Sequence, residues 1–65
     1  MRICITFQQK VNSRKLYEEL KDFKVNVTDL ETEVYAYRND ISLIEIPQVL
    51  VICDKYGLYD ISITK

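Results

Sequence analysis

Hydrophobic and polar residues alternate over residues 2–7, where Ile3, Ile5 and Phe7 have one parity and the residues between them the other. Alternation with a period of two places successive side chains on opposite faces of a strand. The segment is also rich in β-branched residues, which favour strands. We therefore predict a first strand over residues 2–7, with its larger hydrophobic side chains turned toward the core.

A different spacing follows the first strand. Leu16, Leu20 and Phe23 recur at intervals of three and four residues, which places them on one face of a helix. Asn12 stands just before them and is a suitable N-cap residue, because its side chain can accept a hydrogen bond from a free backbone amide of the first turn. Residues 13–23 are therefore predicted to form an amphipathic helix.

The middle of the chain predicts a β-hairpin. Residues 33–38 and 41–46 both alternate, and the dipeptide Asn39-Asp40 between them suits a two-residue turn, since both residue types tolerate a positive φ. A further turn or bulge is expected over residues 28–32, because the hydrophobic positions before and after this segment have opposite parity.

The last third of the chain predicts a helix and a final strand. Pro47 ends the preceding strand and suits the first position of a helix. Hydrophobic residues then follow at helical spacing and Gly57 supplies a stop, so residues 47–56 are predicted to be a second helix. The competing interpretation is a buried strand over residues 49–52, which β-propensity favours. Residues 58–64 alternate again and predict the last strand.

This order of elements predicts the fold. A chain of 65 residues allows a single domain, residues 1–65, with one small core. Strand, helix, strand, strand, helix, strand is the order of the ferredoxin-like split βαββαβ unit, an α+β fold. With right-handed crossovers, we expect a four-stranded antiparallel sheet in the spatial order 4-1-3-2, with both helices on one face.

The predicted fold leaves one face of the sheet open, and large side chains gather there. The residues expected to form an interface on this open face are Cys4, Tyr35, Tyr37, Ile44 and Ile46. Clustered exposed apolar and aromatic side chains usually mark an interface, and small chains gain stability by oligomerising. We therefore predict a small non-enzymatic binding or interaction domain that self-associates through its open sheet face, as a homodimer or with another protein partner.

Composition argues against catalysis and against metal or cofactor binding. The chain has no histidine, which removes the commonest general base and metal ligand. Its cysteines, Cys4 and Cys53, form no C-x-x-C pair, and the predicted fold places the sheet between them. No segment approaches the roughly 18 apolar residues of a membrane span, and the first residues do not resemble a secretion signal. We expect a cytoplasmic protein with reduced thiols and no membrane partner.

Charge is distributed unevenly, although the net charge is −1. Residues 1–24 hold six basic and three acidic residues, whereas the rest of the chain holds three basic and seven acidic ones. Free backbone amides at the start of a helix hold phosphate or carboxylate groups, so a small-anion-binding regulatory module is one alternative. Its candidate residues are Lys10, Asn12, Ser13, Arg14 and Lys15. The simpler interpretation is that these cations are solvated and pair with Glu18 and Glu19 on the next turn.

A second alternative is binding of single-stranded nucleic acid or RNA. Tyr35 and Tyr37, together with the basic first helix, could stack on unpaired bases and contact phosphates. The acidic balance of the whole chain disfavours this function, and the Gly- and Lys/Arg-bearing motif of RNA-recognition sheets is absent. The two tyrosines could equally pack along an edge strand with their hydroxyl groups in water.

Overall fold

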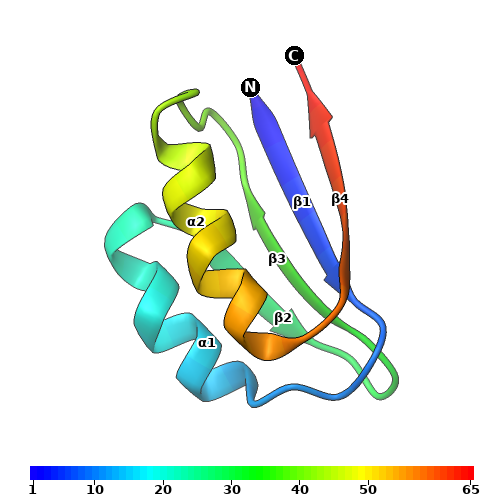
Figure 1. Ribbon diagram of the computed structural model, residues 1–65. Helices are drawn as coiled ribbons and strands as arrows, with labels where there is room; N and C mark the ends of the chain where they lie inside the picture. Colours follow the sequence, from blue (N-terminus) through cyan, green and yellow to red (C-terminus); the bar gives the residue numbers. More distant parts are fainter.

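The computed structural model describes residues 1–65 and contains a four-stranded sheet with two helices on one of its faces (Figure 1). The elements in chain order are β1 (Arg2–Phe7), α1 (Ser13–Leu20), β2 (Asn26–Asp29), β3 (Val34–Arg38), α2 (Glu45–Cys53) and β4 (Tyr59–Thr64). Every strand pair is antiparallel, and the spatial order is β2-β3-β1-β4. The predicted ferredoxin-like α+β fold is confirmed, with the predicted order of strands counted along the chain, but the second and third strands are not formed by the predicted residues.

The β2–β3 hairpin lies earlier in the chain than predicted. β2 runs antiparallel to β3 with Val27 opposite Ala36, and the amide of Leu30 donates to the carbonyl of Glu33 at 2.8 Å in the turn between them. The predicted strand over residues 41–46 and the two-residue turn before it are therefore wrong. β3 forms its hairpin with β2, which precedes it in the chain, and not with residues 41–46, which follow it.

The link from β3 to α2 explains why the alternating segment after β3 is not a strand. Asp40 adopts a φ of 67°, as the predicted turn requires, but the chain then leaves the sheet. Ile41 is buried, and its amide donates to the carbonyl of Met1 at 2.7 Å. α2 begins at Glu45, so Pro47 stands in the first helical turn, where its missing N–H removes no hydrogen bond.

The two helices agree with their predicted positions once their short 3₁₀ extensions are included. η1 (Lys21–Phe23) continues α1 to the predicted end at Phe23. η2 (Asp54–Tyr56) continues α2 to Gly57. Gly57 has a φ of 111°, a backbone conformation that residues with a Cβ atom rarely adopt. The alternative strand over residues 49–52 is not formed. Neither α-helix is long and apolar enough to cross a membrane.

The core lies between the helices and the sheet and is asymmetric. Ile3 and Ile5 of β1 are completely buried. Their register partners on β4, Ile63 and Ile61, point to the same face of the sheet but remain 46% and 41% exposed. Figure 1 shows the reason, since the helices lie over the other strands and leave β4 at the uncovered edge. The predicted parity is thus correct, but helical cover ends at β1.

Candidate functional site

The face of the sheet opposite the helices is open, as predicted, but mostly polar. The register places Cys4 of β1 between Tyr37 of β3 and Ser62 of β4, and places Tyr35 next to Thr6. Because β3 is a central strand, the two tyrosines lie in the middle of this face and not at its edge, where an edge position had been predicted. We call this surface the open face.

The apolar part of the predicted interface is not on the open face. Ile46 belongs to α2 and is buried in the core with 7% of its surface exposed. Ile44 stands immediately before α2, in the helical layer, where it is 77% exposed. The prediction for both residues fails because they were assigned to a strand that the structure does not form. Cys4, Tyr35 and Tyr37 are the predicted interface residues that the sheet does bring together.

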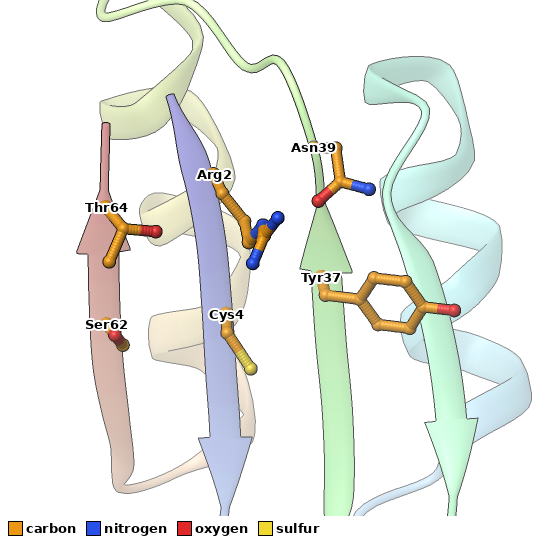
Figure 2. Close-up of a pocket in the computed structure, with 6 residues that line it drawn as sticks. All are labelled: Arg2, Cys4, Tyr37, Asn39, Ser62 and Thr64. Carbon is orange, nitrogen blue, oxygen red and sulfur yellow. The ribbon is translucent and has the colours of Figure 1, made fainter.

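A hollow of about 500 Å³ occupies the Arg2 end of the open face (Figure 2). Its lining residues are Arg2, Cys4, Tyr37, Asn39, Ser62 and Thr64. Arg2 carries the hollow's one charged side chain, and it forms no ion pair. None of the six side chains takes part in a hydrogen bond within the chain. The polar groups of the hollow are therefore available to a bound molecule.

Tyr37 differs from the other tyrosine of the open face. The hydroxyl of Tyr35 donates to the carboxylate of Glu33 at 2.7 Å, and this bond raises the pKa of Tyr35. The hydroxyl of Tyr37 has no such partner, and 39% of the residue is exposed. Figure 2 shows its ring lying flat over β2, with one face turned toward the solvent. Tyr37 thus offers a stacking surface that no part of the chain uses.

The structure separates the tyrosines from the basic first helix. α1 packs on the covered face of the sheet, where Leu16 and Leu20 are buried, whereas Tyr35 and Tyr37 lie on the opposite face. One ligand cannot contact both groups side by side. The predicted combination of stacking tyrosines with helix cations is therefore not formed.

The predicted anion site at the start of α1 is occupied by the carboxylate of Asp29 from the same chain. Lys10 Nζ lies 2.6 Å from Asp29 Oδ1, and Ser13 Oγ donates to Asp29 Oδ2 at 2.8 Å. These bonds hold the pKa of Asp29 below its usual value. Asn12 is the N-cap, as predicted, and accepts a hydrogen bond from the amide of Lys15 at 3.1 Å. Binding of an external anion here stays a prediction, and such an anion would compete with Asp29.

The two acidic residues of α1 pair with other basic residues than those expected. Glu18 binds Lys21 at 2.9 Å, and Glu19 binds Lys55 and the hydroxyl of Tyr56 beside α2. The expected bonds from Arg14 and Lys15 to these two carboxylates are not formed. The contacts of Glu19 lower its pKa and tie the two helices together.

A second exposed surface, which the sequence did not predict, lies on β4, on the face of the sheet that carries the helices. At the start of the strand, the hydroxyl of Tyr59 donates to Asp54 of η2 at 2.5 Å, which joins β4 to the end of the helical layer. Beyond this contact, Ile61 and Ile63 are 41% and 46% exposed on the face of the sheet that carries the helices. We call these two side chains the β4 strip.

The two edges of the sheet differ in their protection. β2 has four residues, and its last residue, Asp29, is held by Lys10 and Ser13. β4 has six residues, contains no proline or lysine, and has Asp60 as its single charged residue. Natural edge strands are usually blunted by short length, charge, proline or a covering segment. β4 is therefore the edge that can accept another strand.

The two cysteines have different environments, which predicts different reactivities. Cys4 is partly exposed on the open face, whereas Cys53 is fully buried, and burial raises the pKa of its thiol to about 12. Because the thiolate is the reactive species, we expect a maleimide to modify one thiol rapidly in the folded protein and the second only after urea is added. Mass spectrometry of digested samples should place the first label on Cys4. Equal labelling of both thiols in the native protein would contradict this arrangement.

Comparison of the chain with protein-family models, with curated proteins and with solved structures found no match. No group of three or more cysteine, aspartate or glutamate side chains is placed to hold a metal ion. The structure offers two exposed surfaces to a partner or ligand, the open face with its hollow and the β4 strip.

Proposed function

We propose that this chain is a non-enzymatic interaction domain whose partner is a second copy of itself, joined edge to edge through β4. One observation carries the proposal. Ile61 and Ile63 of β4 remain 41% and 46% exposed, and β4 is an edge strand without the proline, lysine or short length that usually prevents pairing with another strand. Exposed apolar side chains in a contiguous group usually mark an interface, and an open strand edge is a template for pairing with another chain.

The sequence of β4 is self-complementary in an antiparallel arrangement. Directly opposite residues of two antiparallel strands point to the same face, so a pairing is acceptable only if it matches the parity of both copies. With Ser62 opposite Ser62 of the second copy, each Ile61 faces an Ile63 and each Asp60 faces a Thr64. The isoleucines of both copies then form one apolar row, and the two Asp60 carboxylates stay apart.

The expected strength of this dimer follows from the area it covers. Complete burial of an isoleucine side chain contributes about 1.5–3 kcal/mol, so the isoleucines of both copies contribute at most about 3–6 kcal/mol, because the second strand covers them from one side only. Main-chain hydrogen bonds between the two strands add to this. We therefore expect a reversible dimer whose population rises with concentration.

Light scattering after size-exclusion chromatography tests the proposal. The chain has a mass of 7.7 kDa, and the mass measured for the unaltered protein should rise toward twice this value as its concentration increases. Ile63→Lys should remain a monomer, because it places a charge within the apolar row. Tyr17→Lys is the matched control, since Tyr17 is also 46% exposed but lies on α1.

Two results would reject self-association through β4. One is a monomer mass for the unaltered protein at every concentration. The other is a loss of the dimer in Tyr17→Lys as complete as the loss in Ile63→Lys. Circular dichroism of each variant should show that the fold is retained, so that a monomer cannot be mistaken for an unfolded chain.

A further inference from the structure

The hollow lies on the opposite face of the sheet from the β4 strip, and its chemistry points to a ligand of its own. It combines a flat aromatic ring, an unpaired cation and several unbonded polar groups, and no carboxylate lines it. We propose that the hollow binds one nucleotide, with the base stacked on Tyr37 and the phosphate held by Arg2. This site does not depend on self-association.

Tyr37 is placed to stack on a base. Its side chain leaves the central strand β3, its ring lies over β2 with one face exposed (Figure 2), and its hydroxyl is free to bond with the edge of a ligand. Every base has a π-face, and stacking on an aromatic side chain changes affinity by about 5-fold to 150-fold per base. Buried aromatic rings of the core, such as Phe7, have no comparable free face.

Arg2 is placed to hold the phosphate. Figure 2 shows its side chain extending from β1 toward β3, while the ring of Tyr37 extends from β3 over β2, so the phosphate and the base of one ligand would lie on neighbouring parts of the open face. A guanidinium group can donate two parallel hydrogen bonds to a phosphate. The guanidinium of Arg2 forms no ion pair with a carboxylate of the chain, so it is free to do so. Lys10, by contrast, already binds Asp29. Asn39, Ser62 and Thr64 supply further polar contacts around the ligand.

The far end of the open face limits the length of the ligand. Tyr35 is bonded there to Glu33, and Asp60 accepts a hydrogen bond from Gln8 at 2.6 Å. These carboxylates would repel the phosphates of a strand that crossed the whole face. The site therefore suits one nucleotide, either free in solution or at the end of a single strand.

Titration of the isotope-labelled protein with adenosine monophosphate, followed by NMR, tests the proposal. Saturable shifts are expected at the amides of Cys4, Tyr37 and Ser62. Tyr37→Leu should weaken binding at least about 5-fold, whereas Tyr37→Phe should keep most of it. Arg2→Gln should weaken binding of adenosine monophosphate but leave binding of adenosine unchanged. Tyr17→Leu, which alters an exposed tyrosine of α1, should have no effect.

A second titration with an adenylate hexanucleotide separates the two sources of the ligand. Stronger binding of the hexanucleotide assigns the site to the end of a strand, and equal or weaker binding assigns it to free nucleotides. Absence of saturable shifts with both probes would overturn the proposal, as would binding that Tyr37→Leu leaves intact. Repeating the titration with Ile63→Lys keeps this result independent of the dimer, because that substitution lies on the other face of the sheet.

Discussion

Replacing Phe7 by alanine is expected to lower the free energy of unfolding by about 3–5 kcal/mol. Phe7 is completely buried at the end of β1, and its ring lies 5.6 Å from that of Tyr59 at an interplanar angle of 57°. It lies opposite Val34 on one neighbouring strand and Tyr59 on the other. The substitution removes the largest buried side chain and leaves a cavity between the sheet and the helices.

A loss of this size is a large part of the whole stability of a small domain. Stability of roughly 0.05–0.15 kcal/mol per residue gives about 3–10 kcal/mol for a chain of 65 residues. We therefore expect Phe7→Ala to be partly or largely unfolded in water, as measured by urea denaturation and circular dichroism. Tyr17→Ala, at an exposed position, should change stability by no more than about 0.5 kcal/mol. A cost below about 1 kcal/mol for Phe7→Ala would contradict the placement of the core.

Stability is also expected to fall steeply as the pH rises from 9 toward 12. Burial raises the pKa of Cys53 from 9.0 to about 12. Burial and the bond to Glu19 raise the pKa of Tyr56 to about 12, and the bond to Asp54 and burial raise that of Tyr59 to about 12. These groups lose protons at lower pH in the unfolded chain than in the folded one. Their stabilisation is complete below the unfolded pKa and is lost as the pH rises through the folded pKa.

Cys53 makes the largest single contribution, because it is completely buried and its pKa rises furthest. Each pKa unit corresponds to about 1.4 kcal/mol, so the rise from 9.0 to about 12 corresponds to about 4 kcal/mol. Urea denaturation between pH 8 and pH 12 should show the decline, and Cys53→Ala should flatten its first part, above pH 9. The comparison uses the slope of stability against pH, because this substitution also removes packing. A stability that does not change over this range would rule out the buried neutral thiol.

The strands at the two ends of the chain could be predicted from the sequence because each alternates strictly. Parity alone places Ile3 and Ile5 of β1 in the core and turns Ile61 and Ile63 of β4 to the same face. It cannot show how far the helices extend over that face. The β4 strip was missed for this reason, although the predicted strand order already put the last strand at an edge.

The middle of the chain was mispredicted because two alternating segments competed for one partner. The Asn39-Asp40 dipeptide favoured pairing with the following segment, whereas β3 pairs with β2. A local signal for the correct answer was present. Ser42 and Glu45 have the spacing of a capping box. In the structure they form a turn in which the amide of Glu45 donates to the carbonyl of Ser42 and Ser42 Oγ donates to Glu45 Oε1, both at 3.1 Å, while the N-cap position itself is Ile44. The helix therefore begins before Pro47, so Ile44 and Ile46 belong to the start of α2 and not to a strand.

The candidate sites were predicted to different degrees. Cys4, Tyr35 and Tyr37 share one face as their parity requires, and Asn12, Lys10 and Ser13 meet at the start of α1. The bond of Asp29 to this helix start could not be foreseen, because it depends on where β2 ends. The hollow beside Tyr37 depends in the same way on the central position of β3.

A disulfide at position 62 would test the pairing of β4 with its copy most directly. Ser62 is opposite its own counterpart in the proposed register, and directly opposite residues lie within disulfide distance. Because Cys4 is the neighbour of Ser62 within one chain, Ser62→Cys is made together with Cys4→Ser. Thr64→Cys with Cys4→Ser is the control, since position 64 faces Asp60 of the second copy and not another cysteine. Mild oxidation should yield a covalent dimer for Ser62→Cys and little for Thr64→Cys, whereas equal yields, or none for either variant, would contradict the pairing.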